Sequence, residues 1–148
     1  MTNVSDLSRG VNKIDKERPY NDGKWTQGQM NSFIKSLLRS GTRRWGPKNE
    51  TLKKARVEKG KYLCNGCKTV VPVTIVKNGK RVRFVQVDHV IPVVDSDTGF
   101  VSWDNYINRM FCNSDNYQLL CSDCHYSKTS SERMIATERK KRDKNTNG

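Results

Sequence analysis

The sequence predicts an α+β fold in which short β-strands lie between amphipathic helices. Residues 73–77 and 80–87 alternate in polarity and are rich in β-branched side chains. Asn78 and Gly79 lie between them, and this dipeptide is a strong hairpin signal because both turn positions need positive φ. Apolar side chains recur at helical spacing before and after this pair, over residues 30–38 and 103–111. The length of 148 residues suits one domain with basic arms.

Two helices are predicted before the hairpin. Thr26 can cap the first, with Gln29 three positions later in a capping-box pattern, and Gly41 ends it. The second is predicted over residues 47–59, with Gly60 as its stop. It is thin in apolar residues and dense in lysine and arginine, which is typical of a solvated face or of a surface that follows phosphates. We favour the second interpretation.

The elements after the hairpin are shorter. Ser102 can cap a helix whose apolar stripe, from Trp103 to Phe111, is expected to face the core. A brief strand over residues 118–120 leads into a helix that opens at Ser122 or Asp123, and residues 139–148 are predicted to be disordered. The predicted organisation has four parts: a flexible arm at 1–24, a basic helical region at 25–61, a core at 62–130 and a basic tail at 131–148.

Positive charge is concentrated at the two ends of the chain. The net charge is +13 with a pI of about 9.8, of which residues 1–61 carry +9, residues 62–126 carry zero and residues 127–148 carry +4. Basic flanks around a neutral centre favour a polyanionic partner, because lysine and arginine contacts with phosphates release counterions. A merely soluble basic surface or adhesion to acidic membranes is the alternative. No apolar run approaches the roughly 18 residues of a membrane span, so a soluble intracellular protein is expected.

Four of the five cysteines form two Cys-x-x-Cys pairs, Cys64 with Cys67 and Cys121 with Cys124. In an intracellular chain this pattern predicts one four-thiolate zinc site rather than disulfides. Two unrelated pairs or a redox motif would be the alternative, but a redox pair should begin a helix in a βαβ pattern, which is not visible here. The remaining Cys112 is expected to be a small buried apolar residue.

The two histidines both lie beside acidic or metal-binding residue types. His89 follows Asp88 at the end of a predicted strand, and His125 follows Cys124. A neutral imidazole near pH 7 can deprotonate water, and a divalent cation held by carboxylate and imidazole can stabilise a phosphodiester transition state. Neighbours on a regular strand point to opposite faces, so a bend at Pro92, or the end of the strand, is expected to turn one toward the site of the other.

The spacing of these residues resembles the HNH endonuclease family. The residues that carry the resemblance are Cys64-x-x-Cys67, Val-Asp88-His89-Val-Ile-Pro, Asp-Asn116-Tyr-Gln-Leu-Leu-Cys121-x-x-Cys124-His125 and Lys128-Thr129. The resemblance covers residues 64–129 and implies a ββα-metal finger. It also implies that His89 is the general base, that Asp88 and His125 bind a catalytic Mg²⁺ or Mn²⁺ (alternatively Ni²⁺ or Zn²⁺), and that Asn116 braces the loop that orients the base. The four cysteines match the structural zinc of one branch of the family. The connection over residues 90–115 is longer than in a minimal finger.

The resulting hypothesis is a DNA endonuclease, similar to small phage-encoded or mobile-element HNH proteins, in a bacterial cytoplasm. The expected DNA contacts come from basic side chains in the helical region and one in the last helix: Arg43, Arg44, Lys53, Lys54, Arg56 and Lys128. A non-catalytic zinc-ribbon or adaptor protein is the alternative, although it has no need for Asp88, His89 and His125 together. An RNA nuclease or a nuclease toxin would use the same core.

Overall fold

The computed structural model describes residues 17–148, and these divide into two compact units, 17–40 and 41–148. The predicted arm over residues 1–24 lies largely outside the described residues. Helix α1 (Gln27–Gly41) begins with the predicted capping box. The Thr26 amide donates to Gln29 Oε1 at 2.9 Å, and the Gln29 amide donates to Thr26 Oγ1 at 3.2 Å. The expected start and end of this helix are therefore confirmed.

The second unit is a mixture of short antiparallel sheets and helices, as expected for an α+β fold. Three sheets are present among the described residues: β1-β2-β3, β4-β5 and β6-β7. Their strands are β1 (Arg56–Glu58), β2 (Lys61–Leu63), β3 (Val70–Pro72), β4 (Thr74–Lys77), β5 (Lys80–Arg83), β6 (Val85–His89) and β7 (Tyr117–Cys121). The helices are η2 (Thr42–Arg44), α2 (Gly46–Ala55), α3 (Trp103–Met110), η3 (Ser114–Asn116) and α4 (Ser122–Thr146).

The predicted second helix is shorter than its sequence pattern indicates. Helix α2 ends at Ala55, and residues 56–58 form β1, which pairs with β2 across a turn at Gly60. Gly60 has φ +75, so it serves a tight turn rather than a helix stop. Tertiary pairing thus overrides the helical propensity of a lysine- and arginine-rich segment.

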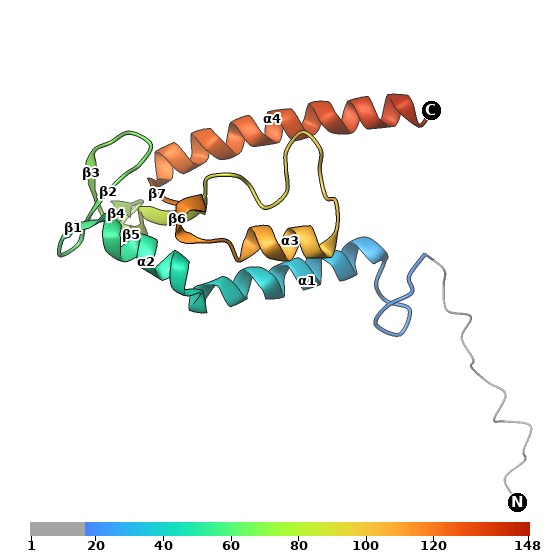
Figure 1. Ribbon diagram of the computed structural model, residues 1–148, viewed down its shortest axis with the longest axis horizontal. Coiled ribbons are helices and arrows are strands. Elements are labelled where there is room, and N and C mark those ends of the chain that lie inside the picture. Colours follow the sequence, from blue (N-terminus) through green and yellow to red (C-terminus); the bar gives the residue numbers. More distant parts are fainter. Residues whose placement is uncertain (1–16) are drawn as a thin grey trace, which may run out of the picture. The chain divides into compact units, whose positions relative to one another are not determined.

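The predicted strand over residues 80–87 is two strands with different partners. The hairpin turn at Asn78 and Gly79 forms as expected, with both residues at positive φ, and β5 pairs with β4. At Phe84 the chain leaves this pair: its amide donates to Val73 and its carbonyl accepts from Ser122, each at 2.8 Å. From Val85 onward, β6 pairs with β7, and Figure 1 shows β7 leading directly into α4.

The core of this unit is small and contains two of the cysteines. Leu119 and Val85 are fully buried, and Cys64, Leu120 and Cys121 form one buried cluster against which Phe84 packs. Ser102 caps α3 by accepting from the Asn105 amide at 3.1 Å. The helix buries Tyr106 and Met110, as the apolar stripe predicts. Cys112 is only half-buried, against expectation.

The C-terminal segment is helical where disorder is expected. Helix α4 continues to Thr146 without an apolar face, so hydrophobic periodicity gives no signal for it. Contacts with the loop over residues 95–99 hold it instead. Arg139 Nη1 donates to the Asp95 and Ser96 carbonyls, each at 3.3 Å, and Arg142 donates to the Asp97 carbonyl at 3.0 Å. Within the described residues, no helix is long and apolar enough to cross a membrane.

Candidate functional site

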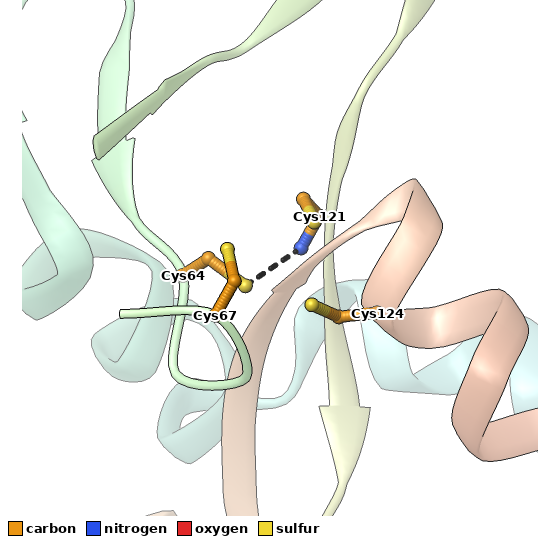
Figure 2. Close-up of side chains that lie close together, drawn as sticks. All are labelled: Cys64, Cys67, Cys121 and Cys124. Carbon is orange, nitrogen blue, oxygen red and sulfur yellow. Dashed lines mark hydrogen bonds between the residues drawn. The ribbon is translucent and has the colours of Figure 1, made fainter. Parts of the chain in front are cut away.

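Four cysteine side chains meet at one point although they come from distant parts of the chain. Figure 2 shows Cys64 and Cys67 facing Cys121 and Cys124, and the four sulfur atoms lie within 4.8 Å of one another. A tetrahedral zinc ion with Zn–S bonds of about 2.3 Å needs sulfur atoms about 3.8 Å apart. The cluster can therefore hold a metal ion such as zinc, and it is the only group of three or more potential ligands of its kind in residues 17–148.

Backbone contacts hold the two cysteine pairs together. Cys64 follows β2, while Cys121 ends β7 and Cys124 lies in the first turn of α4. The Cys121 amide donates to Cys64 Sγ at 3.3 Å, drawn in Figure 2, and the Asn65 amide donates to the Leu119 carbonyl at 2.8 Å. This arrangement fixes the first pair to the strand that carries the second.

The thiols differ in how readily they lose a proton. Burial raises the pKa of Cys64, but backbone amides of Cys121, Cys67 and Gly66 outweigh it and lower this pKa to about 6. A hydrogen bond with the Cys121 thiol, followed by burial, raises the pKa of Cys124 to about 12. One thiolate thus forms near neutral pH, and a bound cation would favour deprotonation of the others.

Gly66 is required by the close approach of the two pairs. A Cβ at this position would lie 2.8 Å from both Cβ and Sγ of Cys124. We expect Gly66→Ala to lower the melting temperature by several degrees and to reduce the zinc retained per chain, because the first pair must move away from α4. Gly46→Ala is the matched control, since a Cβ there meets nothing within 4 Å. Equal zinc content and melting temperature in the two variants would contradict this account.

Asp88 and His125 are brought together at the junction of β6 and α4. His125 Nε2 lies 3.9 Å from Asp88 Oδ1, and Lys128 Nζ lies 2.9 Å from Asp88 Oδ2. This second oxygen is buried and has no hydrogen-bond partner besides the Lys128 ammonium group. Lys128 also pairs with Glu132. Although burial acts to lower the pKa of Lys128, its hydrogen bonds with Glu132 and Asp88 raise it overall.

His89 is held with one ring nitrogen engaged. Its Nε2 lies 3.0 Å from the Met110 carbonyl oxygen, which can only accept, so Nε2 carries the proton and Nδ1 is the basic nitrogen. The ring also packs on Tyr117, with centroids 4.8 Å apart. Burial is the main cause that lowers the pKa of His89 below its usual value. The imidazole is thus neutral and oriented at pH 7.

The strand does not bend to bring Asp88 and His89 together. It stays paired through His89, with Asp88 opposite Gln118 and His89 opposite Tyr117. Asp88 meets residues of α4, whereas His89 meets the end of α3. The expectation that the two neighbours turn toward one site is therefore wrong. Their side chains lie on opposite faces of one regular strand.

Asn116 braces the segment that follows His89. Its Oδ1 accepts from the Ile91 amide at 2.9 Å, its Nδ2 donates to the Ile91 carbonyl at 3.3 Å, and its own carbonyl accepts from the Val90 amide at 2.8 Å. The side chain thus closes a ring of two hydrogen bonds with one residue 25 positions earlier. This anchors the chain next to the histidine.

Most of the basic residues predicted to contact DNA are exposed. These are Arg43, Arg44, Lys53, Lys54 and Arg56. Lys128 differs from them because it is half-buried and paired with two carboxylates. Its ammonium group is therefore committed to the Asp88 site rather than presented to solvent.

The role of the Met110 carbonyl in the site is not indicated by the sequence motif. The Met110 carbonyl at the end of α3 accepts from His89 and also from the Tyr117 hydroxyl at 2.9 Å. Burial is the main cause that raises the pKa of Tyr117, so this hydroxyl stays protonated. The length of the connection over residues 90–115 indicates an additional element near the site, and α3 inside this connection supplies the carbonyl.

No family model matches the chain, and no curated protein or solved structure matches it either.

Proposed function

We propose that this protein is a metal-dependent HNH-type endonuclease that hydrolyses DNA phosphodiester bonds. One observation carries the proposal: Asp88 and His125, which are far apart in sequence, form a carboxylate and imidazole pair, and the next residue on the same strand, His89, is a neutral and oriented imidazole. His89 and Asp88 share β6, while Asn116 and His125 flank β7, and the two strands pair in register. Two antiparallel strands followed directly by α4 support the ββα-metal arrangement.

His89 is the general base of the proposed reaction. The Met110 carbonyl holds the Nε2 proton, so Nδ1 can accept a proton from the attacking water. The low pKa of the ring, caused mainly by burial, keeps this nitrogen unprotonated at pH 7. Tyr117 fixes the plane of the ring, and the Tyr117 hydroxyl shares the same carbonyl.

Asp88 and His125 fit the ligands of a divalent cation. Metal–ligand bonds of about 2.1 Å can bridge atoms that lie 3.9 Å apart. Asp88 Oδ2 is buried against the Lys128 ammonium group, so Oδ1 is the oxygen that lies toward His125 and would bind the cation. A cation with only two protein ligands completes its shell with water and substrate phosphate, as Mg²⁺ commonly does. Bound there, it would supply stabilisation of negative charge on the leaving oxygen.

The role of Asn116 gives a separate prediction. Asn116→Ala removes both side-chain hydrogen bonds to Ile91, so the chain after His89 loses its brace. We expect the turnover rate to fall about tenfold or more, since misplacing a base costs on the order of 1.4 kcal/mol or more in the barrier. Binding of DNA should change little. Asn108→Ala, an exposed asparagine on α3, is the control and should cleave at the wild-type rate. Equal turnover by both variants would remove Asn116 from the site.

The proposal is tested by incubating the purified protein with supercoiled, linear and branched DNA across Mg²⁺, Mn²⁺, Ni²⁺ and Zn²⁺. Nicked or linear product that needs a divalent cation supports it. The same assay with RNA of matching sequence distinguishes an RNA nuclease. Absence of any product with both nucleic acids would refute hydrolysis.

One observation favours a non-catalytic alternative. The Lys128 ammonium group already lies 2.9 Å from Asp88 Oδ2, where it provides the positive charge that a cation would otherwise supply. In a zinc-stabilised nucleic-acid-binding module this ion pair would be permanent. Such a module binds DNA under the conditions above without cleaving it.

A further inference from the structure

A pocket lined by three cationic side chains lies beside β6 in the second unit. Its volume is about 580 Å³, and its lining comes from η2, α2, β5 and β6. The cations are Arg43, Lys48 and Arg83, and the polar neighbours are Asn49 and Gln86. The remaining walls are apolar. Val87 also lines the pocket and lies two residues before His89 on β6, so the pocket adjoins the proposed reaction centre.

The positive charge of this pocket is not balanced by protein carboxylates. Within residues 17–148, no Asp or Glu oxygen lies within 4.0 Å of these three side chains. The side chains of Lys48 and Arg83 donate hydrogen bonds to neutral acceptors instead. Lys48 Nζ donates to Thr42 Oγ1 at 3.2 Å, and Arg83 Nε donates to the Val85 carbonyl at 2.9 Å. These bonds position the cations without neutralising them.

Three physical effects oppose a cation at Lys48. Burial lowers its pKa most, followed by repulsion from Arg43 and from Arg83. Lys48 also lies in the first turn of α2, where the helix dipole disfavours positive charge. The attraction between a bound anion and the Lys48 ammonium group would offset all of these effects. The arrangement is therefore costly in the free protein and suited to a ligand that carries negative charge.

We propose that this pocket binds a phosphate group of the nucleic-acid backbone that flanks the one hydrolysed near His89. Arg43, Lys48 and Arg83 supply the charge, and the side-chain amide of Gln86 is a further donor to phosphate oxygens. Asn49 Nδ2 donates to the Arg43 carbonyl at 3.4 Å and has a second hydrogen for a phosphate oxygen. This inference rests on the proposed function for its ligand. The pocket would set the position of the strand relative to the general base without reading the sequence.

The test compares two charge-matched double variants of the full chain. Lys48→Gln with Arg83→Gln removes two charges from the pocket, and Lys80→Gln with Arg81→Gln removes two from the exposed β4–β5 hairpin. Affinity for a DNA duplex is measured by fluorescence anisotropy between about 50 and 200 mM salt. We expect the pocket variant to lose about tenfold in affinity, and its plot of log K against log salt to flatten by about 0.9, the value of one phosphate contact. Equal losses in both variants would overturn the proposal.

Inorganic phosphate is the second probe, and it needs no catalysis. In ¹⁵N-resolved spectra of the wild type, phosphate should shift the amides of Asn49, Gln86 and Val87 in a saturable way. The pocket variant should show no such shift at the same phosphate concentration and an unchanged melting temperature. Shifts confined to other residues would overturn the proposal. The proposal would also be overturned if free phosphate binds in the pocket but the pocket variant retains full DNA affinity. The ligand would then not be the nucleic-acid backbone.

The outcomes separate this inference from the proposed nuclease activity. If the wild type cleaves DNA, the pocket variant should show a KM raised about tenfold with kcat changed less than threefold. Cleavage by the pocket variant with control-like KM and affinity refutes the phosphate site and leaves the nuclease intact. If the wild type never cleaves DNA, but the pocket variant loses DNA affinity and the phosphate-induced shifts, the phosphate site is supported and the nuclease activity is refuted.

Discussion

Cys121→Ser is expected to leave the protein unfolded at physiological temperature. Cys121 is 3% exposed and lies in the core cluster with Cys64 and Leu120. A structural zinc site contributes on the order of 10 kcal/mol of binding free energy, which is as large as the total stability of a typical domain. With little other core available, the second unit depends on this cluster. Circular dichroism, thermal melting and zinc content per chain measure the effect.

Cys112→Ser is the matched control for this experiment. Cys112 is half-buried and lies outside the four-cysteine cluster. We expect it to change stability by about 1 kcal/mol or less and to retain wild-type zinc. Removal of zinc from the wild type by a chelator should reproduce the unfolding of Cys121→Ser. A cooperative transition at the wild-type temperature in chelator would show that the four thiols are not a structural metal site.

His89→Ala is expected to reduce DNA cleavage by about 10²- to 10⁴-fold, the usual contribution of a general base. The fold should persist, because the side chain is half-buried at a strand end and the Tyr117 hydroxyl still donates to the Met110 carbonyl. In the wild type, kcat/KM should fall as pH drops through the pKa of His89, since the protonated ring cannot accept a proton. Burial is the main cause that lowers the pKa of His89 below its usual value, so the fall in rate should lie on the acidic side of neutrality. Rates are measured on a supercoiled plasmid.

Tyr126→Ala is the control for His89→Ala. Tyr126 is 72% exposed and lies on α4 next to His125. It should cleave at the wild-type rate, whereas His89→Ala should bind DNA normally and melt at the wild-type temperature without cleaving. Wild-type cleavage by His89→Ala would assign the base to another residue.

The local parts of the fold could be predicted from the sequence because single residues determine them. Thr26 with Gln29, Asn78 with Gly79, and Ser102 each impose a cap or a turn through their own chemistry, and the structure contains all three. The cysteine spacing likewise predicted which four thiols meet. Elements that depend on contacts with other segments of the chain could not be predicted from the sequence. Residues 56–58 form a strand because β2 lies beside them, and the end of α4 is helical because Arg139 binds the Asp95 carbonyl.

The motif predicted that Asp88 and His125 belong to one site, and they lie close together in the structure, but the surrounding geometry was not predictable. The motif named Asp88, His89, Asn116 and His125, and the structure brings Asp88 to His125 and Asn116 to Ile91. The motif did not indicate that the Met110 carbonyl would select the tautomer of His89. It also did not indicate that Lys128 would pair with Asp88. Both depend on how α3 and α4 pack against the strand, and sequence spacing carries no information on that packing.

The central proposal is that Asp88 helps to hold a catalytic cation at the junction of β6 and α4. The most direct measurement is the rate at which the zinc-loaded chain converts supercoiled plasmid in Mg²⁺ or Mn²⁺, compared with Asp88→Asn and with the zinc-loaded wild type without added cation. We predict cleavage by the wild type in the added cation, no cleavage without it, and a rate at least 100-fold lower for Asp88→Asn at an unchanged melting temperature. Equal rates for the wild type and Asp88→Asn would contradict the proposal, as would undiminished cleavage without the added cation.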